Sequence, residues 1–374
     1  MEAAWDQPAD CSPNGVPYAR HRPEETLLYR IIDDHYPDFL AQIEADGRTL
    51  PQFVGREFEE YLKCGRLEHG FLRVRCTDCH VEKLVAFSCK RRGFCPSCGA
   101  RRMVESTALL VDEVLPMVPM RQWVLSVPFA VRFLFASNSA AMGEALRIVY
   151  RAISGFLVHK AGLTRNTGQC GAVTLIQRFG SALNLNVHFH MLIPDGVYLT
   201  ETDPPYLRRV SAPTGQELQA LAQRISERIG WHLERKGLLV RDLESSHLAL
   251  EPGDTQDVLT DLQGHSITYR IALGPHQGRK AFMLQSVPPR EEPPGSERVA
   301  QASGFSLHAG VAAEADQRGT LERLCRYIAR PAVAIERLSL TAQGQIRYAL
   351  KTPYRDGTTR ESPAARRSRA SGRS

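Results

Sequence analysis

The order of apolar and polar residues predicts strands interleaved with helices along most of the chain. Apolar residues at three-to-four spacing, typical of amphipathic helices, occur at residues 24–44, 51–64, 102–115, 140–163, 215–237 and 320–330. Alternating or short apolar runs, typical of strands, occur at residues 122–128, 172–179, 184–193, 265–272, 282–287 and 345–354. Gly180-Ser181 separates two of these runs and predicts a hairpin. Hairpins among helices favour an α+β fold with an antiparallel sheet.

The strand at residues 184–193 has two chemically different faces. Side chains alternate along a strand, so His188 and His190 share one face. The residues that alternate with them form the opposite face and are apolar. Two imidazoles two residues apart on a rigid strand can chelate one divalent cation. A pair of half-buried surface histidines is the alternative interpretation.

The composition indicates a cytosolic protein with an excess of positive charge. The chain has 374 residues, a net charge of +6 and nine cysteines. Residues 61–105 hold ten Lys or Arg and four acids, and residues 355–374 hold six Arg and two acids. Positive charge concentrated in two segments favours a nucleic-acid partner over an evenly solvated surface. We expect a bacterial cytoplasmic, nucleoid-associated protein with no membrane partner, since no signal peptide or membrane-length apolar run is visible.

The cysteines predict a structural zinc site instead of disulfide bonds. Cys76 and Cys79 form one C-x2-C pair, and Cys95 and Cys98 form a second after fifteen residues. Four thiolates at these spacings suit one tetrahedral Zn²⁺. The nearby cysteines Cys64 and Cys89 are candidates for an additional zinc site.

Basic residues bracket the second cysteine pair. A scaffold held by zinc would present them to DNA phosphates, and the candidates are Lys90, Arg91, Arg92, Arg101 and Arg102. A structural zinc module without any DNA role is the alternative.

The segment 320–330 carries a tyrosine in an unusual setting. Leu321, Leu324, Cys325 and Ile328 form the buried stripe of the predicted helix, and Tyr327 lies at its edge. Arg323 and Arg330 lie four residues before and three residues after Tyr327, on the same side of the helix. Two guanidiniums beside a phenol suit attack on a phosphodiester. A purely structural tyrosine remains the alternative.

These motifs, in this order, resemble a known family. The cysteine-rich block 88–98, the strand 123–128, His188-Phe189-His190 and the segment 321–331 together look like HUH-type rolling-circle transposases of the insertion sequence ninety-one type. The similarity extends over about residues 24–358. In two-tyrosine relatives a second tyrosine lies four residues before the later one. Arg323 occupies that position here, so the chain resembles the single-tyrosine, common-region type.

The resemblance implies a domain plan and a mechanism. It implies a helical, zinc- and DNA-binding module at 24–110, and an HUH endonuclease domain at 111–358 with an insertion at about 201–300. His188 and His190 would hold Mg²⁺ or Mn²⁺, and Tyr327 would form a 5′-phosphotyrosine link with single-stranded DNA at element ends. The third metal ligand has no assignment from the sequence. Residues 359–374 read as a disordered Arg/Ser-rich tail, and we expect a truncated copy whose activity is in question.

Two other function classes are compatible with the same residues. A replication initiator or conjugative relaxase would use the same HUH chemistry for another purpose. A non-enzymatic, zinc-dependent nucleic-acid-binding protein would need the cysteine module without Tyr327 or the histidine pair.

Overall fold

The computed structural model divides the chain into two compact units. It describes residues 20–91, 93–241, 246–248, 258–274, 276–285, 299–350 and 358–362. Unit 1 comprises Met1–Arg102 and Pro331–Ser339, and unit 2 comprises Met103–Arg330 and Leu340–Ser374. Unit 1 is mainly helical and unit 2 contains an antiparallel sheet with flanking helices, so the predicted α+β class is confirmed.

Unit 1 is built on two helices that the apolar spacing predicted. Helix α1 (Leu27–Ala45) begins at Thr26, whose side chain accepts a hydrogen bond from the Tyr29 amide and so caps the helix. Helix α2 (Gln52–Lys63) packs against it through aromatic side chains, and the rings of Tyr36 and Phe58 stack with centroids 4.7 Å apart. Short 3-10 turns lie at η1 (Pro23–Glu25), η2 (Leu67–His69) and η5 (Ile335–Arg337).

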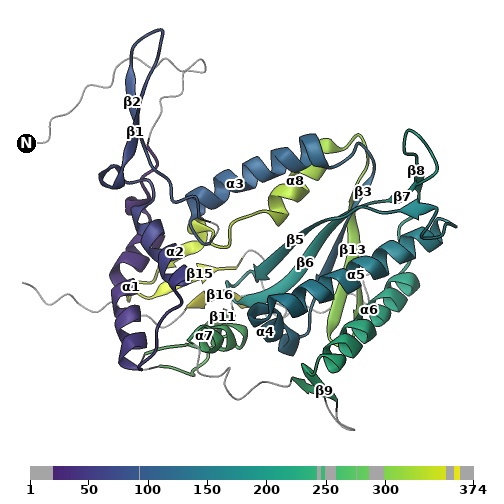
Figure 1. Ribbon diagram of the computed structural model, residues 1–374. Helices are drawn as coiled ribbons and strands as arrows, with labels where there is room; N and C mark the ends of the chain where they lie inside the picture. The colour runs from purple at the N-terminus through teal and green to yellow at the C-terminus, as the bar shows by residue number, and fades with distance from the viewer. Residues whose placement is uncertain are drawn as a thin grey trace, which may run out of the picture. The chain divides into compact units, whose positions relative to one another are not determined.

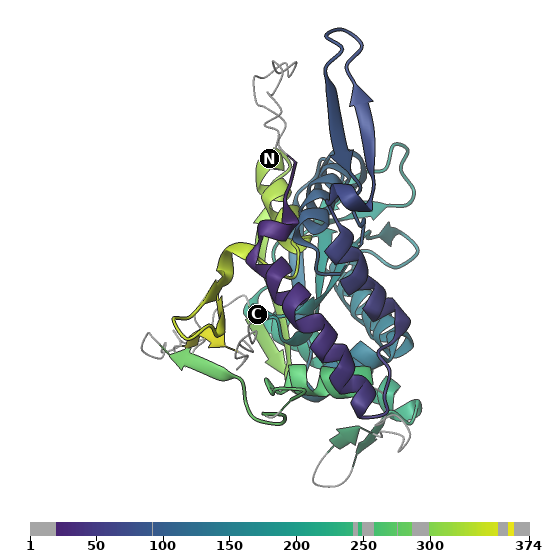
Figure 2. The ribbon, with the colours of Figure 1, turned by 90° about the vertical axis from the view of Figure 1, so that its left-hand side faces the viewer.

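A hairpin in unit 1 was missed by the sequence analysis. Strands β1 (Phe71–Arg75) and β2 (Glu82–Ala86) pair antiparallel, with Phe71 opposite Ala86. Figure 2 shows the hairpin as a long two-stranded ribbon extending away from helices α1 and α2. Its strands mix apolar and charged residues and stay largely exposed, so no buried face produces a clear period-two pattern.

The centre of unit 2 is a five-stranded sheet in the order β12-β13-β3-β6-β5, with every neighbouring pair antiparallel. Its strands are β12 (Val299–Ala302), β13 (Phe305–Ala313), β3 (Met120–Ser126), β6 (Leu185–Pro194) and β5 (Val173–Phe179). The predicted hairpin of residues 172–179 and 184–193 is therefore present as β5 and β6. Strand β6 lies between two neighbours and is buried from Phe189 onward.

Helices cover both faces of this sheet. Helices α5 (Ser139–Lys160) and α6 (Gly215–Arg235) lie side by side against one face (Figure 1), where their apolar residues join Val187, Phe189 and Met191 in the main core. Helix α8 (Arg318–Ile328) and the π-helical turn η3 (Leu110–Val114) share a second core with Leu192 on the opposite face. The alternation of β6 thus separates two cores.

The described residues contain further helices and strands. They are α3 (Pro96–Leu109), α4 (Phe129–Ser137), β4 (Gly168–Gln169), β7 (Gly196–Leu199), β8 (Leu207–Arg209), β9 (Leu239–Arg241), β10 (Ser246–Leu248), α7 (Val258–Ile267), β11 (Phe282–Gln285), β14 (Leu338–Leu340), β15 (Ile346–Ala349) and β16 (Thr358–Ser362).

Two predicted segments differ from the structure. Residues 265–267 end helix α7, and Arg270 makes only an isolated bridge with Lys280, so the strand predicted at 265–272 is wrong; short apolar runs suit either element. Residues 359–362 belong to β16, which pairs with β11 and β15, so the predicted disordered tail does not begin at residue 359. Residues 359–362 form a strand because their backbone pairs with distant strands, and local composition does not predict such pairing. Residues 286–298 and 363–374 lie outside the described residues.

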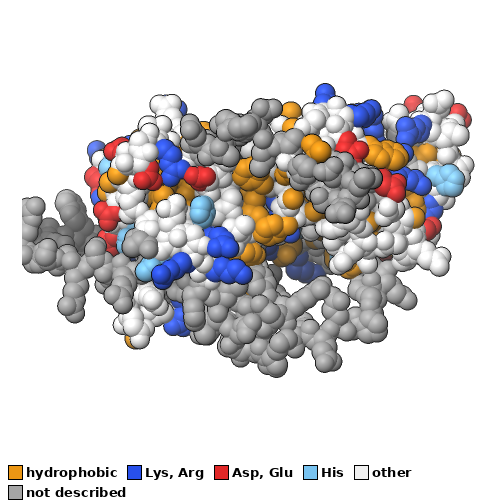
Figure 3. All heavy atoms as spheres, turned by 90° about the horizontal axis from the view of Figure 1, so that it is seen from below, with side chains coloured by type: hydrophobic (Ala, Val, Ile, Leu, Met, Phe, Trp, Pro, Cys, Tyr) orange, Lys and Arg blue, Asp and Glu red, His pale blue; other side chains and the backbone are white. Residues whose placement is uncertain are grey.

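The described surface carries its charge in patches. On the face shown in Figure 3, Lys and Arg side chains lie in small groups separated by acidic and uncharged side chains. Among the described residues, the helices are all too short or too polar to cross a membrane.

Candidate active site and zinc centre

Both histidines of the HUH motif lie on the α8 side of strand β6. His188 and His190 alternate with Val187 and Phe189, which are fully buried in the core under α5 and α6. The two imidazole rings lie close together, with centroids 4.9 Å apart. The alternation therefore places both rings as the sequence predicted.

A glutamine of the neighbouring strand β3 orients His190. The Gln122 amide nitrogen lies 2.7 Å from His190 Nδ1 and donates to it. The other ring nitrogen, Nε2, is buried without a hydrogen-bond partner. Burial, followed by the nearby His188 and the positive charge of Arg330, lowers the pKa of His190 to about 3. The ring is therefore neutral at pH 7, and Nε2 can bind a metal if the Gln122 amide rotates to accept the proton of Nδ1.

A second glutamine faces His188. His188 Nδ1 donates to the Asn186 carbonyl at 2.7 Å, so the neutral ring keeps its lone pair on Nε2. That nitrogen lies 2.8 Å from Oε1 of Gln177 on strand β5, which is only 5% exposed. Burial and the charges of Arg330 and Arg132 lower the pKa of His188, which disfavours a proton between the two acceptors.

The three groups fit a small divalent cation. Ligands about 2.1 Å from an octahedral Mg²⁺ lie about 3 Å from each other, and His188 Nε2 and Gln177 Oε1 are 2.8 Å apart. The partnerless Nε2 of His190 offers a further ligand atom beside them. Two ring nitrogens and an amide oxygen gathered in this way form a mixed donor set that suits such a cation. Gln177 was missed from the sequence because only the β5–β6 register, which sets Gln177 opposite His188, brings it to the site.

Helix α8 brings Tyr327 to the histidines. Its stripe of Leu321, Leu324, Cys325 and Ile328 is buried in the second core, as predicted. Tyr327 lies beside this stripe, 42% exposed, with its ring nearly perpendicular to that of His190 and the centroids 6.3 Å apart.

The two arginines flanking Tyr327 behave differently. The Arg330 guanidinium lies over the Tyr327 ring, 4.2 Å from its centroid, and its Nη1 is buried without a hydrogen-bond partner. Arg323 is exposed and donates to the Thr320 hydroxyl at 3.0 Å. Arg132 on α4, which the sequence analysis did not select, adds positive charge near His188. The site therefore combines a phenol, a set of ligand atoms compatible with a cation, and guanidinium groups suited to a phosphate.

Unit 1 gathers four cysteines at a second centre. The thiols of Cys64, Cys89, Cys95 and Cys98 all lie within 4.8 Å of one another. Sulfurs of Cys64 and Cys98, Cys89 and Cys98, and Cys95 and Cys64 are 3.7, 3.5 and 3.8 Å apart. Four sulfurs about 2.3 Å from a tetrahedral Zn²⁺ lie about 3.8 Å apart. Hydrogen bonds from neighbouring thiols hold the pKa of Cys98 well below its ordinary value, so the cluster favours a thiolate.

The four clustered cysteines therefore differ from the four that the spacing predicted as ligands of one zinc ion. Cys95 and Cys98 are joined by Cys64 and Cys89, the two cysteines predicted for an additional site, and not by Cys76 and Cys79. Residues 76–81 form the turn of the β1–β2 hairpin, closed by a hydrogen bond from the Cys76 amide to the Val81 carbonyl. A C-x2-C spacing is compatible with a tight turn as well as with a metal site. Long-range packing determines which of the two each pair of cysteines forms.

The predicted DNA-binding residues flank the zinc cluster. Lys90 and Arg101 are exposed, while Arg91 and Arg102 are half-buried. Arg102 donates to the Lys90 carbonyl at 2.9 Å and so braces the loop before Cys95. Arg92 lies outside the described residues.

Comparison with family models identifies the class of protein. A family model described as "Transposase zinc-binding domain" matches residues 31–127, which include all four clustered cysteines. A model described as "Putative transposase" matches residues 171–366, more than half of the chain, including the histidine strand and α8. No curated protein and no solved structure matches significantly. Fold and site define a zinc-containing DNA transposase. The chain belongs to the transposase family of the insertion sequence ninety-one type.

Proposed function

We propose that this transposase cuts and rejoins single-stranded DNA through a covalent tyrosine intermediate, as in rolling-circle transposition. The single observation that carries the proposal is the position of Tyr327 beside His190, with ring centroids 6.3 Å apart. It places a phenol, a strong candidate nucleophile for a phosphodiester, next to a buried nitrogen that lacks a partner.

His188, His190 and Gln177 would hold Mg²⁺ or Mn²⁺. The two histidines offer Nε2 and the glutamine offers Oε1, a mixed set that both ions accept. Such an ion would polarise the scissile phosphate and neutralise charge on its oxygens. The Asn186 carbonyl and the Gln122 amide orient the two rings from behind, so the ligand geometry is set before DNA arrives.

Tyr327 would attack the phosphorus in line with the leaving 3′ oxygen. The bond from phosphorus to tyrosine Oη forms, the bond from phosphorus to O3′ breaks, and the released 3′ oxygen takes up a proton. The products are a 5′-phosphotyrosine and a free 3′-hydroxyl. When a 3′-hydroxyl of another strand attacks this phosphotyrosine, tyrosine leaves and the strand is transferred.

Arg330 would stabilise charge during both steps. Its guanidinium lies over the tyrosine ring and adds positive charge near both histidines. A cation in that position favours a developing phenolate and an incoming phosphate alike. Arg323 occupies the position of the second tyrosine of two-tyrosine relatives, so the proposed mechanism uses one tyrosine.

The zinc-containing unit would hold the DNA near the element end. Zn²⁺ on Cys64, Cys89, Cys95 and Cys98 would fix the loop that carries Lys90 and Arg91 and the start of α3 with Arg101. These cations are suited to phosphate contacts, which position DNA without reading its sequence.

A trapped adduct tests the proposal. The protein is incubated with Mn²⁺ and single-stranded oligonucleotides from the ends of its element, labelled at the 3′ end, because the fragment bearing the 5′-phosphotyrosine keeps that end. We expect a labelled band that migrates with the denatured protein and is absent when Mn²⁺ is omitted. Binding without any covalent band, or a band formed equally well with duplex DNA, contradicts the proposal.

A further inference from the structure

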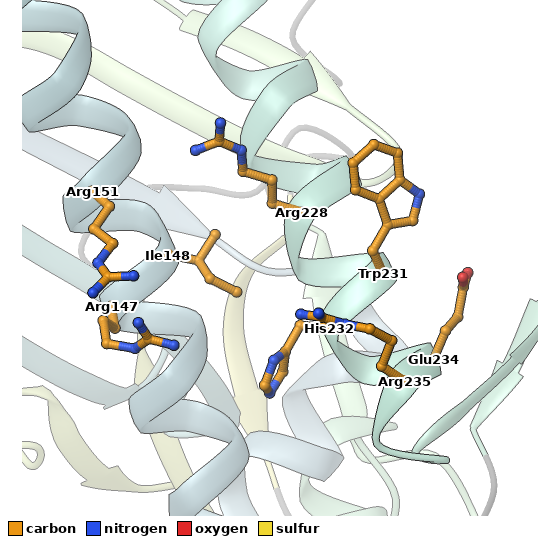
Figure 4. Close-up of a pocket in the computed structure, with 8 residues that line it drawn as sticks. All are labelled: Arg147, Ile148, Arg151, Arg228, Trp231, His232, Glu234 and Arg235. Carbon is orange, nitrogen blue, oxygen red and sulfur yellow. The ribbon is translucent and has the colours of Figure 1, made fainter.

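Helices α5 and α6 form an arginine-lined cleft. One part has a volume of about 530 Å³ and is lined by Arg147, Arg151, Arg228 and Arg235 together with Trp231 (Figure 4). A second part of about 300 Å³ adds Arg165 and Arg224. Arg151 and Arg228 line both parts, so they form one continuous track.

Helical spacing arranges these arginines in two facing rows. Arg147 and Arg151 are one turn apart on α5, and Gly155, the next position in that row, leaves room beside Arg165. Arg224, Arg228 and Arg235 follow one stripe of α6. All six arginines are exposed.

Most of this positive charge has no acidic partner among the residues that the structure describes. Arg147 bonds to Glu144 on its own helix, with its Nε 2.9 Å from the carboxylate. Within the described part of the chain, Arg151, Arg165, Arg224, Arg228 and Arg235 form no ion pair or side-chain hydrogen bond. Figure 4 shows the one acidic side chain of the cleft, Glu234, on the side of α6 that points away from α5. Like charges gathered in this way repel one another, and a polyanion relieves that repulsion.

The cleft is separate from the histidine site. Helices α5 and α6 cover the sheet face that contains Val187 and Phe189, whereas His188 and His190 point to the opposite face, beneath α8. A DNA segment lying in the cleft is therefore a different segment from the one at Tyr327.

An exposed aromatic side chain indicates which form of nucleic acid fits. Trp231 lies beside Arg228 and is 55% exposed, although it is large and apolar. A cationic groove bordered by an exposed aromatic ring is typical of single-strand binding, since unpaired bases stack on the ring while the arginines follow the phosphates. Duplex DNA keeps its bases stacked internally and would leave Trp231 uncovered.

We infer that the α5–α6 cleft is a second, sequence-independent binding track for single-stranded DNA. Phosphates would lie between the arginine rows, and a base would stack on Trp231. The track would hold a strand that is not being cut, which a strand-transfer enzyme must keep near its active site.

Charge-removing variants test the track without cleavage. Anisotropy of a fluorescent thirty-nucleotide oligothymidine is measured across 50–200 mM salt with no Mg²⁺ or Mn²⁺ added, so that the proposed nicking lacks its ion while the zinc site keeps its metal. R151Q/R224Q/R228Q should weaken binding at least tenfold at 100 mM salt and lower the log–log salt slope by about 2, because each lost phosphate contact removes about 0.7. The matched control R208Q/R209Q/R279Q removes three exposed arginines of unit 2 outside the cleft and should stay within twofold of the parent chain.

Substitutions of Trp231 distinguish single-stranded from duplex DNA as the ligand. In the parent chain, bound single-stranded DNA should quench tryptophan fluorescence. The W231F variant should bind DNA normally but lose most of that quenching. The W231A variant should bind DNA several-fold more weakly. Duplex DNA of equal length should show no W231A effect. Equal binding by the cleft variant and its control would show that the arginines serve another partner, such as an acidic protein. Duplex binding that depends on the arginines but not on Trp231 would overturn the single-strand inference.

Because these measurements need neither metal nor the nucleophile, they are independent of the proposed cleavage chemistry. Circular dichroism melting of each variant shows whether it is folded. A folded cleft variant with parent-like affinity contradicts the inference whatever the result of the adduct assay.

Discussion

The ring of Tyr327 lies nearly perpendicular to the ring of His190, with 6.3 Å between the centroids. The tyrosine comes from α8 and the histidine from β6, and both elements contribute to one buried cluster through Leu324, Ile328 and Leu192. The geometry of the candidate active site therefore depends on how α8 packs against the sheet.

Tyr327→Phe should abolish the covalent DNA adduct and leave the fold intact. The change removes one oxygen from an exposed side chain, so the free energy of unfolding should change by no more than about 1 kcal/mol. Adduct formation and thermal melting are measured together. The control Tyr206→Phe alters another exposed tyrosine and should retain full adduct formation. Peptide mapping that finds DNA on a different tyrosine would show that Tyr327 is not the nucleophile.

Gln177→Leu should raise the Mn²⁺ concentration needed for half-maximal cleavage by at least tenfold, because it removes one of three oxygen or nitrogen ligands. Gln177→Glu should restore or tighten metal binding, since a carboxylate is a stronger ligand for a hard cation. Cleavage is measured over a metal titration. An unchanged titration in the Leu variant would exclude Gln177 as a ligand.

His188→Ala and His190→Ala should each abolish metal-dependent cleavage. His190 is only 4% exposed, so its truncation to alanine leaves a cavity. His190→Gln fills more of that space and is the better test at this position. Native-rate cleavage by a folded variant of either histidine would contradict the metal site.

Cys64→Ser should remove bound zinc and lower the melting temperature of the protein, whereas Cys76→Ser should do neither. Only Cys64 belongs to the four-sulfur cluster, and structural zinc contributes directly to folding free energy. Metal analysis of both purified variants gives the zinc content per chain. Loss of zinc from Cys76→Ser, with retention in Cys64→Ser, would support the original sequence-based ligand set over the structural one.

Arg330→Gln should slow cleavage by about 10²-fold or more, the usual cost of removing one stabiliser of developing charge. Arg323→Gln is the matched control and should slow it by much less, because Arg323 is exposed and bonds to Thr320. Single-turnover adduct formation at saturating Mn²⁺ measures both. Equal effects would mean that the contact between Arg330 and Tyr327 has no special role.

Local patterns in the sequence predicted much of the candidate site. Alternation in residues 184–193 placed the two histidines on one face, and the apolar stripe of α8 placed Tyr327 at its edge. Both predictions concern side-chain direction within one element, which backbone periodicity determines by itself. His188, His190 and Tyr327 could accordingly be selected as candidates before the fold was known.

Contacts between distant elements were not predictable in the same way. Gln177 and Gln122 reach the histidines through strand register, and Cys64 joins Cys98 through the packing of unit 1. Spacing along the chain favoured Cys76 and Cys79, but it carries no information about which pair folds into a hairpin turn.

The arginine-lined cleft is the clearest example of a feature that local sequence patterns do not predict. Helix α6 holds three arginines and three glutamates, so its linear charge is zero and composition indicated nothing there. Helical geometry gathers the arginines on one stripe, and the pairing of α6 with α5 adds a second row. The sequence by itself determined most of the long elements, the faces of β6 and α8, and the candidate reactive residues, because these depend on short-range periodicity. Only the tertiary structure decided which candidate metal ligands and which cations meet, because those neighbours are set by long-range packing.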